Sequence, residues 1–222
     1  MISPNSHSEI VRGIIEPGVV GIIRATSSSQ LIHVVEALKK GGVTAIEVTM
    51  TTPNALDVIR EVNARFGRDI VMGVGTVLDT GTCKAALLAG ASFVVTPVVK
   101  PEVIRLCRRY ARPIICGAYT PTEILAAWEC GADFIKVFPA DNLGPDYIKA
   151  IKAPLPQVEL IPTGGVDLNT AGDFIKAGCA AVAVGSSLIS RKVLESKNWA
   201  ELVVTARKFI QTVSKARQDR TK

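Results

Sequence analysis

The sequence predicts an α/β protein, a single (β/α)8 barrel of the TIM type, because short apolar strands alternate with stretches whose apolar residues recur at helical spacing. Regular alternation implies parallel strands joined by right-handed crossovers. The length of 222 residues suits eight such units in one domain. An open doubly wound sheet is the alternative, but no G-x-G-x-x-G motif follows the first strand.

Four segments share one pattern, a helical run that ends in glycine and is followed within a few residues by an apolar strand. Glycine is expected at this point because it adopts the left-handed conformation that ends a helix at little cost. The strands expected after these glycines are residues 45–49, 93–96, 134–138 and 181–184. Four more apolar runs lie between them, at residues 19–24, 70–76, 113–118 and 158–162.

Helical periodicity fills the intervals between the strands. It predicts helices over residues 29–40, 54–66, 80–88, 101–110, 122–129 and 168–176, and a last helix over 198–214. The barrel is expected over about 17–190, after an N-terminal segment (1–16) with a short helix and before a C-terminal helix and basic tail (191–222). Residues 1 to about 8 and the tail after Ser214 are expected to be poorly ordered.

The composition is that of an ordinary globular protein, with 48% hydrophobic and 21% charged residues, which excludes disorder, collagen and coiled coils. No apolar run reaches the ~18 residues needed to span a bilayer, and the start lacks a signal-peptide pattern, so we expect a cytoplasmic protein without membrane contact. The net charge of +6 is largely terminal. Because no stacking aromatic residues are interleaved with these charges, no nucleic-acid partner is expected.

Cysteine and histidine usage gives no indication of a metal site. The five cysteines are far apart and form no C-x-x-C motif, so neither a disulfide framework nor zinc is expected, and we interpret them as small buried hydrophobic residues. The only histidines are His7 and His33. Their number argues against histidine-based nucleophilic catalysis, and His33, on a helical stretch, is expected to be structural.

Lys136 places an ammonium group in the middle of the apolar strand Phe-Ile-Lys-Val-Phe. Strand side chains alternate, so Lys136 shares a face with Phe134 and Phe138. Burying a lysine is costly unless it is paired or loses its proton, and a neutral amine near a second cation such as Arg24 can attack a carbonyl. The alternative is an edge lysine that reaches solvent, which a barrel without edge strands disfavours.

Glu47 is the matching polar residue in the second strand. Even-numbered barrel strands supply the same interior layer, so Glu47 and Lys136 can face one another across the barrel. A carboxylate beside a reactive amine can move protons during imine formation. A purely structural buried ion pair, most simply with Arg24, is the alternative.

Two glycine-containing turns follow the seventh and eighth strands, Thr163-Gly164-Gly165 and Gly185-Ser186-Ser187. Barrels commonly hold phosphate at this place with backbone N–H groups. A Gly-Gly turn alone is as often ordinary turn chemistry, but two such turns at successive strand ends predict a phosphate site.

Together these residues resemble the class I aldolases that cleave 2-keto-3-deoxy-6-phosphogluconate and the 4-hydroxy-2-oxoglutarate aldolases. The resemblance covers about residues 19–189. Its motifs are Ile-Ile-Arg24-Ala, Glu47-Val-Thr, Gly73-Val-Gly-Thr76-Val, Thr120-Pro-Thr-Glu123, Lys136-Val-Phe-Pro139-Ala and Pro162-Thr-Gly-Gly165-Val. It implies that Lys136 forms a Schiff base and that Glu47 is the general acid and base. It also implies substrate contacts by Arg24, Thr49, Thr76, Pro97 and Thr163, and phosphate contacts by Gly164, Gly165, Gly185, Ser186 and Ser187.

The resemblance further implies reversible cleavage of a phosphorylated 2-keto acid to pyruvate and glyceraldehyde 3-phosphate by a homotrimer, with no metal and no organic cofactor. The galactonate isomer and 4-hydroxy-2-oxoglutarate, which yields pyruvate and glyoxylate, stay open as substrates. Three residues depart from the family pattern: Thr51 replaces a common arginine, Val98 a common glycine and Cys116 a common proline. The rivals are a phosphate-binding isomerase or synthase, which leaves Lys136 unexplained, and a non-catalytic barrel, against which intact Lys136 and Glu47 argue.

Overall fold

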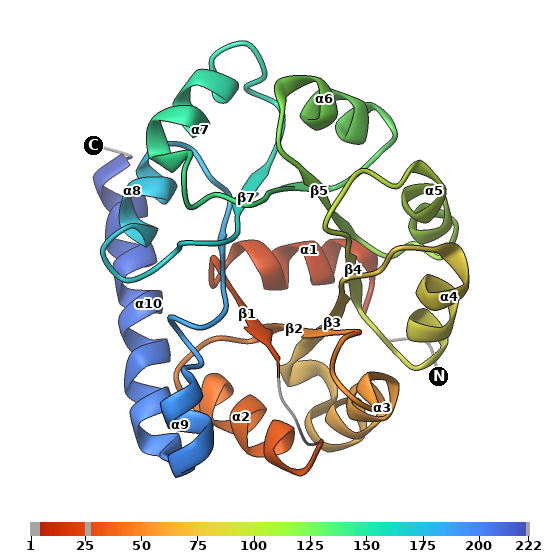
Figure 1. Cartoon of the computed structure of the whole chain (residues 1–222), viewed down its shortest axis with the longest axis vertical. Helices are drawn as coiled ribbons and strands as arrows, with labels where there is room; N and C mark the ends of the chain where they lie inside the picture. Colours follow the sequence, from red (N-terminus) through yellow and green to blue (C-terminus); the bar gives the residue numbers. More distant parts are fainter. Residues whose placement is uncertain (1–4, 25–27, 221–222) are drawn as a thin grey trace.

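The computed structural model describes residues 5–24 and 28–220, and shows a ring of strands surrounded by helices (Figure 1). Eight parallel strands follow the order β7-β6-β5-β4-β3-β2-β1-β8. A parallel bridge between Thr163 and Ala183 spans the remaining gap between β7 and β8. The predicted (β/α)8 barrel is therefore confirmed, as a nearly closed barrel.

Each predicted strand is present, with ends within two residues of those expected. The strands are β1 Val19–Ile23, β2 Ala45–Thr49, β3 Val71–Gly75, β4 Phe93–Val95, β5 Ile114–Ala118, β6 Phe134–Val137, β7 Leu160–Pro162 and β8 Val182–Val184. Their residues are buried throughout because one face packs on the helices and the other fills the barrel.

The helices surround the barrel in the expected alternation. They are α1 His7–Ile15, α2 Ser28–Lys40, α3 Ala55–Phe66, α4 Thr80–Leu88, α5 Pro101–Arg109, α6 Pro121–Glu129, α7 Gly144–Lys152, α8 Ala171–Lys176, α9 Arg191–Ser196 and α10 Trp199–Arg220, with a short 3-10 helix at Gly67–Asp69. Helices α7 and α9 were not among the predicted ranges, and α9 is too short to show a helical period. None of the helices in the described part of the chain has both the length and the hydropathy needed to cross a membrane.

The motif Thr120-Pro-Thr-Glu123 has a local structural explanation at the start of α6. The Thr120 hydroxyl accepts a hydrogen bond from the Glu123 N–H at 3.3 Å, and the Glu123 carboxylate accepts from the N–H groups of Tyr119 and Thr120 at 2.8 Å. These N–H groups lower the pKa of Glu123 because they stabilise its charged form. The motif is a capping box that fixes where α6 begins after β5.

The cysteines and His33 pack as structural residues, as expected. Four of the five cysteines are buried, Cys130 is half-buried, and all five are free. Cys83 Sγ and Cys107 Sγ lie 3.6 Å apart in the helix layer, between α4 and α5. His33 stacks on Trp199 with ring centroids 5.9 Å apart, which joins α2 to α10.

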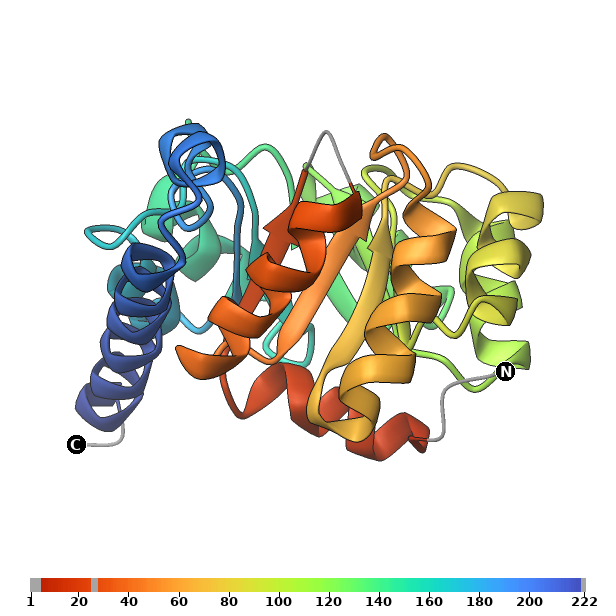
Figure 2. The same cartoon turned by 90° about the horizontal axis from the view of Figure 1, so that it is seen from below.

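Helix α1 closes the N-terminal end of the barrel, beneath the strands in Figure 2. Ile10 and Ile14 are fully buried there and belong to the core inside the barrel. Ser6 caps the helix by accepting from the Glu9 N–H, and the Glu9 carboxylate accepts from the Ser6 N–H. The expectation of poor order up to about residue 8 is therefore wrong from residue 5 onward, because this capping box was missed.

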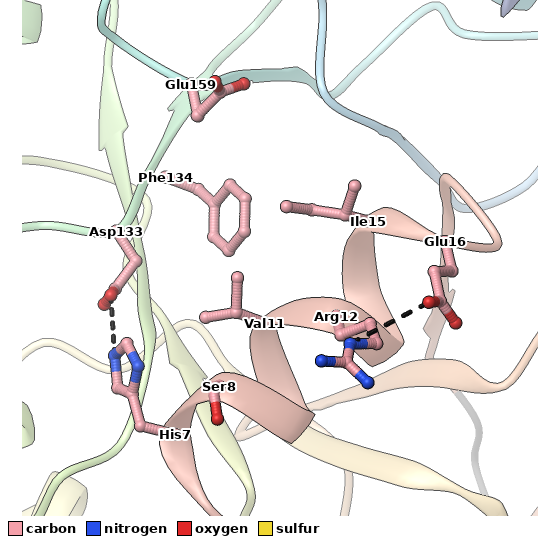
Figure 3. Close-up of a pocket in the computed structure, with 9 residues that line it drawn as sticks. All are labelled: His7, Ser8, Val11, Arg12, Ile15, Glu16, Asp133, Phe134 and Glu159. Atoms are coloured by element: carbon pink, nitrogen blue, oxygen red, sulfur yellow. Dashed lines mark ion pairs between the residues drawn. The ribbon is translucent and has the colours of Figure 1, made fainter.

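A pocket of about 460 Å³ lies between α1 and the start of β6 (Figure 3). Val11, Ile15 and Phe134 point into it, and the pair formed by His7 Nε2 and Asp133 Oδ1, 2.7 Å apart, stands at one side. This pocket is at the N-terminal end of the strands, opposite the end where barrel enzymes place their chemistry.

Arg217 ties α10 to the rest of the molecule. Its guanidinium donates to the carbonyls of Ile15 (2.6 Å), Glu16 (2.8 Å) and Ala180 (2.7 Å), which join the end of α1 to the approach to β8. The helix extends to Arg220, packed against α2 and α8 (Figure 1). The expected disordered tail after Ser214 is therefore wrong as far as residue 220, because Arg217 is a packed donor and not a solvated charge.

We predict that Arg217→Met lowers the free energy of unfolding by about 2–4 kcal/mol, because three carbonyls lose a charged donor. Urea denaturation followed by circular dichroism measures this change. Arg207→Met, on an exposed position of the same helix, is the control and should change stability by less than about 0.5 kcal/mol. Equal effects of the two substitutions would contradict the assignment of Arg217.

Candidate active site

A pocket of about 930 Å³ opens at the C-terminal ends of β1, β6, β7 and β8. Seven of the residues predicted for the site line it: Arg24, Thr163, Gly164, Gly165, Gly185, Ser186 and Ser187. The other five, Lys136, Glu47, Thr49, Thr76 and Pro97, are not on its wall. All five predicted phosphate residues therefore line one pocket, whereas the predicted catalytic residues Lys136 and Glu47 do not line it.

Lys136 adjoins this pocket through an aromatic ring. It lies in β6 with only 7% of its surface exposed, and its Nζ is 4.9 Å from the ring centroid of Phe138, which lines the pocket. Such a contact stabilises a cation through the ring quadrupole. Among the described residues no carboxylate lies within 4.0 Å of Lys136 Nζ. The amine is buried and forms no salt bridge with the residues that the structure describes.

Glu47 lies in β2 and is 2% exposed. Burial raises the pKa of its carboxyl, and the positive charges of Lys136 and Arg24 act in the opposite direction. No described cation lies within 4.0 Å of the carboxylate, so the alternative of a buried ion pair with Arg24 is not what the structure shows. The carboxyl keeps its proton to higher pH than an exposed glutamate, which suits a group that both gives and takes protons.

Threonine hydroxyl groups follow β2, where the family that the sequence resembles commonly has an arginine. The Thr49 hydroxyl lies 2.8 Å from the hydroxyl of Thr51 and 3.4 Å from that of Thr52. Because Thr51 stands where the resembled family commonly has arginine, this edge of the site carries neutral hydrogen-bonding groups. Arg24, exposed at the end of the neighbouring strand β1, supplies a positive charge to the pocket.

Thr163 is 4% exposed, and its hydroxyl has no hydrogen-bond partner among the described residues. A buried hydroxyl without a partner costs about 1–3 kcal/mol. Thr163 also lines the pocket, so an oxygen atom of a bound ligand could supply the missing hydrogen bond.

Thr76, directly after β3, has a left-handed backbone with φ of 61°. This conformation is unfavourable for a β-branched residue and persists only where the surroundings enforce it. Here they do, because the Gly75 carbonyl accepts from the Met50 N–H at 2.9 Å and the Val77 N–H donates to the Val95 carbonyl at 3.2 Å. Backbone strain is thus placed at a predicted substrate residue.

Pro97 follows β4 and packs closely on β5. A Cβ atom built on Gly117 would overlap the Pro97 carbonyl group, so glycine is needed for this approach. The Thr96 hydroxyl accepts from the Gly117 N–H at 3.3 Å and donates to Cys116 Sγ at 3.5 Å. Cys116, which stands where proline is common in the resembled family, is therefore a hydrogen-bond partner at this turn.

Other pocket residues were not found by sequence analysis. One of them is Asp141, which packs directly against Gly164 and Gly165. These two glycines were predicted, and their φ values of 92° and 66° show why glycine occupies the turn. Arg191 and Glu195 also line the pocket, with Arg191 Nε donating to Glu195 Oε1 at 2.7 Å. The sequence feature that could have indicated Arg191 and Glu195 is Ser190, which caps the start of α9 soon after the Gly185 turn.

No cluster of three or more His, Cys, Asp or Glu side chains arranged to hold a metal ion is found within residues 5–24 and 28–220.

We predict that Glu47→Gln stabilises the protein at neutral pH and not at acidic pH. Because the pKa of Glu47 is raised by folding, the stability of the wild type is full below the ordinary glutamate value of 4.5 and falls as pH rises through the folded-state pKa. Glutamine is neutral throughout, so the stability of the variant relative to the wild type should be higher at about pH 8 than at about pH 4. Urea denaturation at both pH values measures the difference.

The control is Glu61→Gln, at an exposed position on α3, which should change the free energy of unfolding by less than about 0.5 kcal/mol. A pH-independent difference for Glu47→Gln would contradict the raised pKa of that residue.

Residues 11–205 match the family described as KDPG and KHG aldolase. A 2-dehydro-3-deoxy-phosphogluconate aldolase of Pseudomonas aeruginosa is 31% identical over 91% of this chain and 92% of its own length. A 2-dehydro-3-deoxy-6-phosphogalactonate aldolase of Escherichia coli K12 is 33% identical over 77% of this chain and 83% of its own. The family resemblance inferred from the sequence is thereby confirmed.

A solved structure of similar fold is that of a KDPG aldolase from Legionella pneumophila with pyruvate captured as a covalent carbinolamine intermediate. Its TM-score is 0.80, at 26% identity over 89% of this chain and 96% of the other. The present chain belongs to the KDPG and KHG aldolase family and is an aldolase, a carbon–carbon lyase.

Proposed function

We propose that the protein cleaves 2-keto-3-deoxy-6-phosphogluconate reversibly to pyruvate and glyceraldehyde 3-phosphate through an imine on Lys136. The observation that carries this proposal is the buried Lys136 amine, free of any salt bridge among the described residues and 4.9 Å from a ring on the pocket wall. An amine in this setting can react as a nucleophile once it is neutral. The Pseudomonas aeruginosa relative, named for this substrate, supports the choice.

In the proposed mechanism the neutral amine of Lys136 attacks the C2 carbonyl carbon of the substrate and forms a carbinolamine. Glu47 gives a proton to the departing hydroxyl, so that water leaves and a protonated imine remains. The Glu47 carboxylate then takes the proton of the C4 hydroxyl. The C3–C4 bond breaks, its electron pair moves into the imine as an enamine, and C4 becomes the aldehyde carbon of glyceraldehyde 3-phosphate.

The enamine is then protonated at C3, and water hydrolyses the imine to release pyruvate and free Lys136. Glu47 suits the repeated proton transfers because burial raises the pKa of its carboxyl while the two nearby cations oppose that shift. No metal or organic cofactor has a role in these reaction steps.

We assign the keto acid end of the substrate to Arg24, Thr49, Thr76, Pro97 and Thr163. The unpartnered Thr163 hydroxyl and the Arg24 charge on the pocket wall support this assignment. The phosphate is assigned to the turns of the same pocket, where N–H groups and hydroxyls can surround an anion. These turns contribute Gly164, Gly165, Gly185, Ser186 and Ser187.

The galactonate isomer of the substrate is the second candidate. The Escherichia coli relative named for 2-dehydro-3-deoxy-6-phosphogalactonate is 33% identical to this chain, and Thr51 leaves hydroxyls where a cation is common. Cleavage of 4-hydroxy-2-oxoglutarate to pyruvate and glyoxylate is a third. An isomerase or synthase without an imine, and a non-catalytic barrel, are not favoured, because family membership and the buried Lys136 both indicate aldol chemistry.

We propose that the protein is a homotrimer and that it works in the cytoplasm. Three large apolar side chains, Leu78, Val98 and Tyr119, are 41–50% exposed on loops after the adjacent strands β3, β4 and β5. Exposed apolar groups on neighbouring loops fit an interface between copies of the chain. Sedimentation equilibrium should give three times the 23.6 kDa chain mass, and a monomer mass would contradict the trimer.

The imine is tested by incubating the protein with pyruvate and sodium borohydride and locating the adduct by peptide mass spectrometry. We expect a reduced pyruvate on Lys136 of the wild type. Lys136→Arg should give no adduct and no cleavage, because a guanidinium stays charged and cannot form this imine. Lys149→Arg, on the exposed side of α7, is the control and should keep both. Lyase activity in Lys136→Arg, or no adduct on folded wild type, would refute the mechanism.

A further inference from the structure

We infer that Gly75, the last residue of β3, is a positioning residue whose missing side chain forms the recess that holds the Glu47 carboxyl group. The inference rests on the proposed function, in which Glu47 moves protons. It adds a residue that acts on the reaction only through another side chain.

The recess is occupied by Glu47. A Cβ atom built on Gly75 would overlap Oε1 and Cδ of Glu47 and would lie 2.8 Å from its Cγ. These are the three atoms nearest to the added carbon. The space beside the Gly75 Cα is therefore used by the carboxyl group of the predicted acid and base.

Backbone conformation does not explain the glycine. Gly75 is not in the left-handed region, and it pairs regularly with Thr49 in the ladder between β2 and β3. Alanine could adopt the same backbone, and glycine within a strand costs about 0.5–1 kcal/mol relative to alanine. A strand glycine of this kind often marks the close approach of another group, which here is the carboxyl of Glu47.

The backbone at Gly75 cannot move away from an added methyl group. The Gly75 carbonyl accepts from the Met50 N–H at 2.9 Å, and the Val77 N–H donates to Val95 at 3.2 Å, with Thr76 held left-handed between them. The end of the Glu47 side chain is the flexible part of the contact. Gly75→Ala should therefore displace the carboxyl and leave the barrel folded.

Another strand glycine shows the contrasting case. A Cβ on Gly117 would overlap the backbone of Pro97, which cannot turn aside as a side chain can. Substitution there should disturb the fold, whereas substitution at Gly75 should disturb the chemistry.

Displacement of the carboxyl should lower turnover by either of two routes. In the wild type the Glu47 carboxylate lies more than 4.0 Å from the Lys136 amine, which has no ion pair within residues 5–24 and 28–220. A carboxylate pushed from its recess either pairs with the amine and holds its proton in place, or turns away from the reacting atoms. Both results remove proton transfer without changing the phosphate turns.

The test is a double-mutant cycle in which Gly75→Ala is placed in the wild type and in Glu47→Gln. In the wild type we expect kcat for pyruvate release to fall about 10²-fold, with KM changed by less than about threefold. Glu47→Gln alone should lower kcat by about 10²–10⁴-fold. Adding Gly75→Ala to it should cost less than about threefold more, because the proton transfer that depends on the recess is already lost.

The matched control is Gly21→Ala in β1, where the added Cβ meets Leu38, Val43 and Leu188 at 3.3–3.5 Å in the helix layer. This variant should keep the wild-type kcat. An unchanged kcat in Gly75→Ala, or an equal fold-loss in both backgrounds, overturns the inference. If the wild type neither cleaves the substrate nor traps pyruvate, the proposed function fails instead, so the two failures are distinguishable.

A second variant covers the case in which Gly75→Ala does not fold. In the double variant Glu47→Asp/Gly75→Ala the carboxylate is one methylene shorter and leaves room for the methyl group. It should restore the far-ultraviolet circular dichroism of the wild type and recover part of the wild-type kcat. Failure to restore either property overturns the inference.

Discussion

The arrangement of the molecule depends on the burial of two ionisable side chains inside a barrel that offers neither of them a salt bridge among the described residues. Lys136 and Glu47 are 7% and 2% exposed, and burial alone would make their charged forms costly. Both side chains lie toward the C-terminal ends of their strands, beyond the apolar residues that fill the N-terminal half of the barrel. Inside the strands, Phe134 and Ala45 occupy the N-terminal half, and the next inward positions are Lys136 and Glu47. An apolar layer in the N-terminal half of the barrel thus lies beneath a polar layer nearer the C-terminal ends of the strands.

The base of the barrel is closed by elements outside the eight repeats. Ile10 and Ile14 of α1 fill the N-terminal opening, and Arg217 of α10 joins the end of α1 to the approach to β8. Solvent is thereby kept from the apolar half, while the opposite half opens into the 930 Å³ pocket. The terminal helices thus leave the C-terminal ends of the strands as the side on which the barrel interior meets solvent.

Much of this could be predicted from the sequence because it follows from periodicity. A lysine or glutamate in the middle of an apolar strand is visible as an exception to the period, and Lys136 and Glu47 were identified in this way. The role of Gly75 was not identified from the sequence. A glycine gives the same sequence pattern whether a turn requires it or whether it leaves room for a carboxyl group from another strand. The left-handed Thr76 results from hydrogen bonds to two neighbouring strands, which no local pattern encodes. Arg217 resembles any basic residue near a helix end until its three carbonyl partners are known.

The gap in the sheet between β7 and β8 has a consequence for ligand binding. These strands are not paired in the ladder, and the Thr163–Ala183 bridge and a 3.0 Å bond from the Ala180 N–H to the Leu160 carbonyl connect them. The Gly164 and Gly185 turns lie on opposite sides of this gap and line one pocket. If both turns hold the phosphate as proposed, the bound anion would connect the two sides of this gap. Closure of the barrel and occupancy of the pocket are then linked equilibria, so that a ligand which tightens the gap also makes the whole ring harder to open.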